Sequence, residues 1–269
     1  MKRQMLPILC AILCLIATAC GNQSAVPAEE IAPVVIGIID TGISSKAIPA
    51  ESVLEGKNYV NPDASTEDTY GHGTAVASVI LAHAPKAKLV PLVSNAYDKG
   101  QIIQVDNDVL AQMIVDAVDV YGCDIINISA GLILDKPAIR EAVEYAEEQN
   151  VLVVASAGND YATEGDFMYY PAGYKTVLAV GSLNTECTAV SAFSQRGPWI
   201  DLYACGEEIT ITTLSGSTRE SDGTSYSAAR VTAYAAELLG QDSTLTASHL
   251  RQKILTYTRT TAEGQKYLP

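Results

Sequence analysis

Residues 34–42 read Val-Val-Ile-Gly-Ile-Ile-Asp-Thr-Gly, an apolar and mostly β-branched run that ends at a carboxylate. A run of this kind is typical of a strand buried on both faces, as in a parallel sheet. Asp40 follows it directly, and the next two residues permit a tight turn, so we expect the carboxylate at the carboxyl end of that strand. A charge there is costly unless it has a role, although turn and helix-cap aspartates are also common at strand ends.

The rest of the chain alternates similar runs with amphipathic segments. Further strands are predicted at Lys88–Val93, Asp124–Ser129, Val151–Ala155 and Thr176–Val180. Helical spacing predicts helices over Gly73–Ala82, Val105–Tyr121, Lys136–Gln149, Thr224–Leu239 and Thr246–Thr256. This alternation predicts an α/β fold, a three-layer, doubly wound and mostly parallel sheet with helices on both faces. In such a sheet, catalytic groups gather at the carboxyl ends of the strands.

The first residues are typical of an export signal. Lys2 and Arg3 precede the apolar run Leu6–Ile16, which is too short to span a membrane comfortably. Small residues before Cys20 favour a lipoprotein signal, with a lipid anchor on that cysteine, although Ala17 stands where such signals usually have leucine. Ordinary cleavage, giving a secreted soluble protein, is the alternative. We expect a signal peptide over 1–20, a flexible tether over 21–33 and one domain over 34–269.

Charge and cysteine content exclude some functions. The formal net charge of −14 argues against nucleic-acid binding, which needs a basic surface, and is explained simply by solubility outside the cell. Cys123, Cys187 and Cys205 remain after the leader and Cys20, an odd number without metal-like spacing. We expect three buried thiols; one disulfide and one buried thiol is the alternative.

One histidine has an unusual setting. His72 lies between two glycines in Gly71-His72-Gly73-Thr74, at the start of a helix rich in small residues. Flanking glycines let the backbone approach a neighbouring segment closely. His83 and His249 lack this setting, and we interpret them as structural.

A serine and an asparagine lie at comparable places. Ser225 opens the long helix that follows Gly223, where backbone N–H groups can stabilise a developing oxyanion; a helix cap is the alternative. Ser227, two residues on, is interpreted as packing. Asn159 ends a strand that runs into small residues, so its amide could donate a hydrogen bond into a cleft; the alternative is a turn asparagine.

Three blocks together resemble the subtilisin-like serine peptidases, and the resemblance runs from Val34 to about Thr256. They are Ile39-Asp40-Thr41-Gly42, Gly71-His72-Gly73-Thr74 and Gly223-Thr224-Ser225. The order Asp, His, Ser distinguishes this family from the chymotrypsin and α/β-hydrolase orders. Asn127–Gly131 and Tyr203–Gly206 fit as well, with Cys205 where proline is usual. Ala229 also replaces a usual proline, which removes no catalytic group.

The resemblance implies a role for each residue. Ser225 is the nucleophile, His72 the general base and then acid, and Asp40 orients the histidine. Asn159 and the Ser225 backbone N–H form the oxyanion hole. The walls of the first specificity pocket are Ser129, Ala130, Gly131, Ala155, Ser156, Ala157 and Gly158. The implied function is cleavage of extended peptides or proteins outside the cytoplasmic membrane; the alternative is a catalytically silent, peptide-binding envelope protein.

No cofactor is needed for this chemistry, and we assign no metal site. The family's calcium dependence does not carry over, because no calcium loop matches residue by residue. Asp63, Asp68, Asp106 and Asp108 are the acidic candidates for calcium ligands, but we interpret them as solvated acids of loops and helix starts, and structural calcium is left open. Segment 21–33 is too short for a folding propeptide, so we expect unaided folding or assistance by another protein. The natural substrate and the oligomeric state are left open by the sequence.

Overall fold

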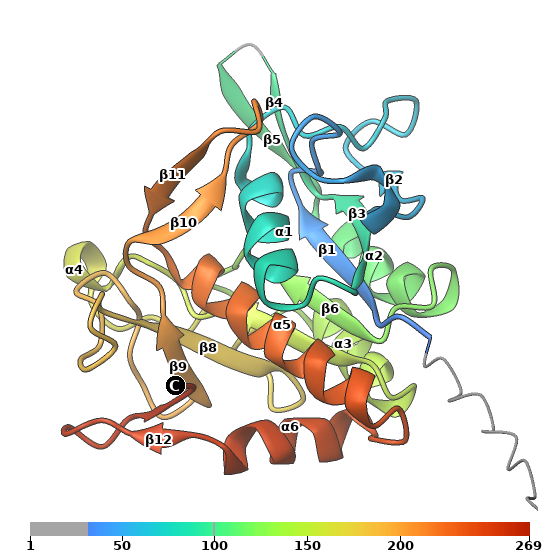
Figure 1. Ribbon diagram of the computed structural model, residues 1–269. Helices are drawn as coiled ribbons and strands as arrows, with labels where there is room; N and C mark the ends of the chain where they lie inside the picture. The colour runs from blue at the N-terminus through green and yellow to red at the C-terminus, as the bar shows by residue number, and fades with distance from the viewer. Residues whose placement is uncertain (1–31, 99) are drawn as a thin grey trace, which may run out of the picture. The chain divides into compact units, whose positions relative to one another are not determined.

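A computed structural model describes residues 32–98 and 100–269 (Figure 1). Its main sheet has the order β12-β13-β9-β8-β7-β6-β1-β3-β2. The strands are β1 (Val35–Asp40), β2 (Lys57–Asn58), β3 (Lys88–Val93), β6 (Ile125–Ile128), β7 (Leu152–Ser156), β8 (Leu178–Leu183), β9 (Leu202–Cys205), β12 (Arg259–Thr260) and β13 (Lys266–Tyr267). All neighbours in it are parallel except β12 and β13. The prediction of a mostly parallel sheet is confirmed. The predicted signal peptide, Cys20 and residues 21–31 of the predicted tether lie outside the described residues.

Helices cover both faces of this sheet. They are α1 (His72–His83), α2 (Asn107–Asp119), α3 (Pro137–Glu148), α4 (Tyr161–Glu164), α5 (Thr224–Gln241) and α6 (Ala247–Thr256), with a 3-10 turn at Ala50–Ser52. In Figure 1, α1 and α5 lie in front of the sheet, and α2 and α3 lie behind it. The predicted helices and strands are all present, with ends that differ by no more than three residues. In this described part of the chain, no helix has the length and apolar character that a membrane span requires.

Strand β1 is apolar along almost its whole length because it is buried on both faces of the sheet. Ile36 and Ile38 pack into the core under α1 and α5, whereas Ile39 packs into the core under α2 and α3. Each is at most 1% exposed. Because successive side chains point to opposite faces, a strand covered on both sides must be apolar at every position. Burial of each side chain contributes about 1.5–3 kcal/mol.

Two small antiparallel hairpins were not predicted. They are β4 (Asn95–Asp98) with β5 (Gln101–Gln104), and β10 (Ile209–Thr212) with β11 (Thr218–Ser221). In Figure 1 the first stands at the top and the second at the upper left. All four residues of β5 are exposed, so no alternation of apolar and polar residues marks it as a strand.

The expectation of three buried thiols is wrong. Cys187 and Cys205 form a disulfide, with Cα atoms 5.1 Å apart, and only Cys123 among the described cysteines is a free, buried thiol. The sheet brings the pair together, because Leu183 pairs with Val190 on one side and with Cys205 of β9 on the other. Burial raises the pKa of the Cys123 thiol to about 12, so it stays protonated.

Candidate active site

Asp40 is the last residue of β1, which lies between β3 and β6 in the sheet. Its side chain is only 3% exposed. One carboxylate oxygen accepts a hydrogen bond from the Thr41 N–H at 2.7 Å. A charge buried this deeply requires a partner.

That partner is His72, the first residue of α1. Its Nδ1 lies 2.8 Å and 2.9 Å from the two carboxylate oxygens of Asp40. The close approach depends on Gly73, because a side chain there would collide with the carbonyl oxygen of Gly42 and reach within 3.2 Å of Asp40 Cβ. The N–H of Gly73 donates to Thr41 Oγ1 at 2.8 Å, which fixes the helix start against the strand end.

The contact with Asp40 sets the state of the imidazole. Burial alone lowers the pKa of His72, but the charge and hydrogen bond of Asp40, with the charge of Asp68, outweigh it, so the pKa is raised. An ionised carboxylate can only accept hydrogen bonds, so Nδ1 is the donor. In the neutral ring Nε2 is then the acceptor, as a general base requires.

Asp68 is not the solvated loop acid that the sequence suggested. It is 4% exposed. One carboxylate oxygen accepts from the N–H groups of Tyr70 and Gly71 at 2.9 Å and 2.7 Å. The other accepts from the N–H and hydroxyl of Thr74 at 2.9 Å and 2.6 Å. It therefore ties the loop before α1 to the first turn of that helix.

The other three aspartates fit their interpretation. Asp106 caps α2 by accepting from the Val109 N–H at 2.9 Å, and Asp63 and Asp108 are exposed. Among residues 32–98 and 100–269, no three His, Cys, Asp or Glu side chains are grouped as metal ligands would be.

Ser225 is the second residue of α5 and is 5% exposed. The helix cap is Gly223, without a side-chain capping bond, so Ser225 is not a cap. Its neighbour Tyr226 has its ring 6.2 Å from that of His72, which places the first turn of α5 beside the imidazole. Ser227 is fully buried and donates to the Ala204 carbonyl at 3.0 Å, which confirms its packing role.

Asn159 is held in one orientation. Its Oδ1 accepts from both the N–H and the hydroxyl of Thr224, each at 2.9 Å, which turns Nδ2 away from this contact. A methyl group placed on Gly223 would lie 3.8 Å from Asn159 Nδ2 and 3.8 Å from the Ser225 nitrogen. Two donors thus flank one point beside the start of α5. Sequence reasoning missed Thr224, whose only signal was its place next to Ser225.

The predicted pocket walls follow two neighbouring parallel strands. Ser129, Ala130 and Gly131 come after β6, and Ala155 and Ser156 end β7 before Ala157 and Gly158. Ala155 and Ala157 are fully buried, and Ala155 belongs to the core under α2 and α3. These alanines can therefore contribute backbone to a wall, but no side-chain contact.

Hollows lie on both sides of His72. One of about 290 Å³ extends over Ser129–Gly131 to the β4–β5 hairpin, and one of about 570 Å³ extends to the β10–β11 hairpin and Tyr226. The two hairpins thus bound a cleft with the imidazole at its middle.

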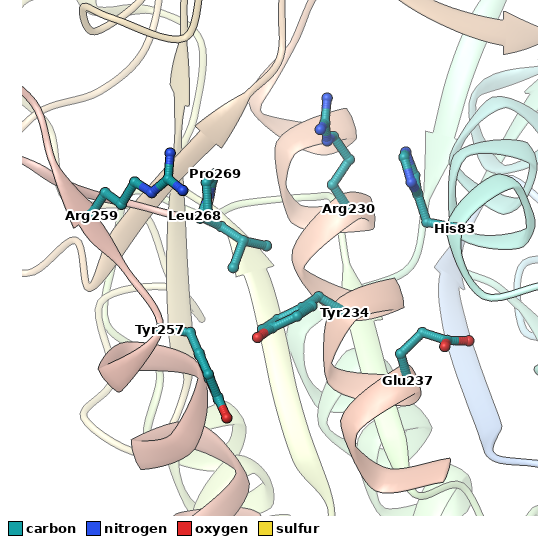
Figure 2. Close-up of a pocket in the computed structure, with 8 residues that line it drawn as sticks. All are labelled: His83, Arg230, Tyr234, Glu237, Tyr257, Arg259, Leu268 and Pro269. Carbon is teal, nitrogen blue, oxygen red and sulfur yellow. The ribbon is translucent and has the colours of Figure 1, made fainter. Parts of the chain in front are cut away.

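A third cavity, of about 390 Å³, lies at the other end of α1 (Figure 2). Its lining residues are His83, Arg230, Tyr234, Glu237, Tyr257, Arg259, Leu268 and Pro269. His83 ends α1, roughly 16 Å along the helix from His72. None of the lining residues is a serine, threonine or cysteine, so the cavity offers no such nucleophile beside His83. The remaining histidine, His249, is an exposed residue of α6.

Comparison with known proteins places the chain among proteases. It matches the Subtilase family over residues 32–267. Subtilisin DY of Bacillus licheniformis is 30% identical over 234 residues, which are 83% of this chain and 82% of that protein. Subtilisin BL of Lederbergia lenta is 34% identical over 212 residues, 75% and 74% of the two chains. Coverage is lower for the thermophilic serine proteinase of Bacillus sp. (strain AK1), of which the chain spans 52% at 30% identity.

Solved structures agree on the fold. A cold adapted subtilisin-like serine proteinase superposes with a TM-score of 0.76 at 24% identity, over 90% of both chains. A lanthipeptide protease gives 0.76 at 24% identity, over 87% of this chain and 84% of that one. With the family match across nearly the whole described chain, this protein belongs to the subtilase family of serine-type peptidases.

Proposed function

We propose that this protein is a serine endopeptidase that works through Asp40, His72 and Ser225 and acts outside the cytoplasmic membrane. The observation that carries the proposal is the contact of His72 Nδ1 with both oxygens of the buried Asp40 carboxylate, at 2.8 Å and 2.9 Å. This contact fixes the tautomer and stabilises the charged ring that forms during catalysis.

Acylation begins at Ser225. Its Oγ attacks the carbonyl carbon of the scissile peptide while its proton moves to Nε2 of His72. The carbonyl oxygen becomes an oxyanion, which accepts hydrogen bonds from Asn159 Nδ2 and the Ser225 N–H. Because Thr224 already holds the Asn159 amide, little reorganisation is needed as this charge develops.

The intermediate then collapses. The C–N bond breaks as His72 gives its proton to the leaving amine, which leaves an acyl ester on Ser225. Water attacks that ester and gives a proton to His72, and the serine leaves with this proton restored. Asp40 stays ionised throughout.

The cleft supports internal cleavage of a longer peptide. Hollows on both sides of His72 leave room for substrate residues before and after the scissile bond. The backbone at Ser129–Gly131, which follows the end of β6, can pair with an extended peptide as an added strand.

The Cys187–Cys205 disulfide supports export, because such bonds persist in oxidising compartments. The names of the relatives alone do not decide the location, since they include a minor extracellular protease and a major intracellular serine protease of Bacillus subtilis. On the pattern of the first 33 residues, we propose a signal peptide (1–20), a tether (21–33) and a peptidase domain (34–269), with a lipid anchor on Cys20.

Covalent labelling tests the activity. The full-length chain, expressed in an exporting host and purified in mild detergent, is treated with a fluorophosphonate probe. Wild type and Ser248→Ala, a change at an exposed serine of α6, should be labelled, and Ser225→Ala should not. Absence of labelling in folded wild type would favour the silent, peptide-binding alternative.

Metabolic labelling with an alkyne fatty acid tests the anchor. Wild type should be labelled and sediment with membranes, whereas Cys20→Ser should be unlabelled. A soluble, unlabelled wild type would indicate the secreted form instead.

A further inference from the structure

The gap between the two predicted pocket walls already holds a side chain. A methyl group placed on Gly131 would lie 3.0 Å from Cδ1 of Tyr169, and one placed on Gly158 would lie 2.6 Å from its Cδ2. The two edges of one phenol ring therefore face glycines from opposite walls. A ring in this position fills space that a substrate side chain would otherwise enter.

Two sets of hydrogen bonds hold Tyr169 in place. Its hydroxyl donates to Asp160 Oδ2 at 2.8 Å. Its neighbour Tyr170 exchanges backbone hydrogen bonds with Leu132, which directly follows Gly131, at 2.8 Å in both directions. The segment that carries the ring is thus paired to one wall, and the ring tip is tied to the residue after Asn159.

The phenol stays a donor over the working range of pH. Burial, followed by the hydrogen bond to Asp160 and its charge, raises the pKa of Tyr169 to about 12. Tyr169 therefore keeps the proton with which it donates to Asp160.

On the basis of the proposed peptidase function, we propose that Tyr169 closes the first specificity pocket, so that the enzyme cleaves after small residues such as alanine and rejects large ones such as phenylalanine. The pocket is shallow because the Tyr169 ring, and not the substrate, occupies the room that Gly131 and Gly158 leave between the walls. A substrate side chain larger than a methyl group would have to displace a ring that is held at both ends.

Selectivity between two peptides tests this. Two fluorogenic peptides are identical except for alanine or phenylalanine on the acyl side of the scissile bond, and kcat/KM is measured for each with the full-length chain. Wild type should prefer alanine by at least about tenfold, in the range that pocket contacts supply. Tyr169→Ala should raise kcat/KM for the phenylalanine peptide by about tenfold or more and change that for the alanine peptide much less. Tyr169→Phe keeps the ring between the two glycines but loses the bond to Asp160, so it should keep most of the preference.

The outcomes separate this inference from the proposed function. Fluorophosphonate labelling of each variant counts active sites first. Labelled enzyme that cleaves the phenylalanine peptide as fast as the alanine peptide, or whose ratio is unchanged in Tyr169→Ala, overturns the role of Tyr169 alone. Folded wild type without labelling overturns the peptidase function instead. If Tyr169→Ala does not fold, Tyr169→Leu, which removes the ring but keeps an apolar side chain, replaces it in the comparison, and an unchanged ratio in that variant overturns the role of Tyr169.

Discussion

Helix α1 carries a histidine at each end, and the two ends differ in every respect that matters for catalysis. His72 meets the carboxylate of Asp40, which together with Asp68 raises its pKa against the effect of burial. His83 lies near Arg230 in the cavity of Figure 2, and burial and that positive charge lower its pKa. The same side chain on the same helix is therefore prepared to accept a proton at one end and to stay neutral at the other.

The difference shows that a histidine becomes a candidate catalytic base only through the residues around it. At His72 the start of α5 supplies a serine, and Asn159 and the serine N–H flank a common point. At His83 the body of α5 supplies Arg230, Tyr234 and Glu237, which offer charges and a phenol but no serine or threonine.

Removing each imidazole should give the largest contrast. His72→Ala should lose nearly all turnover; in subtilisin, a relative, loss of the corresponding histidine costs about 2 × 10⁶ in kcat. His83→Ala should change kcat by less than about threefold, because it contacts no reacting group. Steady-state kinetics on the peptide substrate measures both. Equal losses in the two variants would contradict the assignment of the site to one end of α1.

Changing the charge opposite each histidine should have the next largest effect. Asp40→Asn should lower kcat by about 10⁴, because the ring loses its orienting partner. The acidic limb of the pH–rate profile should also move to lower pH, since activity needs neutral His72 and the carboxylate raises its pKa. Arg230→Gln should leave that limb in place. An unmoved limb in Asp40→Asn would show that another group controls it.

Removing the proposed oxyanion donor, Asn159, should have a smaller effect on turnover. Asn159→Ala should lower kcat by about 10²–10³ with little change in KM, because its amide acts on the charge of the transition state. Thr224→Val removes one of the two bonds that orient the amide and should cost about tenfold. Tyr234→Phe, in the middle of α5 where it lines the cavity of Figure 2, serves as the control. A rise in KM with unchanged kcat would place Asn159 in ground-state binding instead.

The smallest effect concerns stability, and its sign should differ between the two histidines. His72, with a raised pKa, stabilises the fold below its ordinary pKa of 6.5, and this contribution is lost as pH rises through the folded-state value. For His83 the pKa is lowered, so stability falls as pH drops below 6.5 towards the folded-state value. Urea midpoints against pH, in a Ser225→Ala background that cannot digest itself, would show the two slopes. His72→Gln and His83→Gln should each remove one of them, and slopes of the same sign would contradict the assigned neighbours.

Much of the fold was predictable because its signals are local. The apolar run of β1 and the helical spacing of α1, α3 and α5 predicted elements that the structure contains. The β4–β5 hairpin escaped prediction because every residue of β5 is exposed and carries no burial pattern. In the second hairpin, β10 does alternate apolar and polar residues and buries Ile211, but sequence reasoning missed this run of four residues. Asp68 was misjudged for a related reason, since its burial depends on a loop folding back over the start of α1.

The sequence by itself determined the layers of the sheet and the three motif blocks around Asp40, His72 and Ser225, because periodicity and glycine spacing act within a few residues. Only the tertiary structure decided which cysteines pair, which way the Asn159 amide points and what fills the gap between Gly131 and Gly158. Each of these depends on a contact between segments distant in the chain. Such a contact depends on which strands pair in the sheet and how the loops between them pack, and no local sequence pattern predicts that.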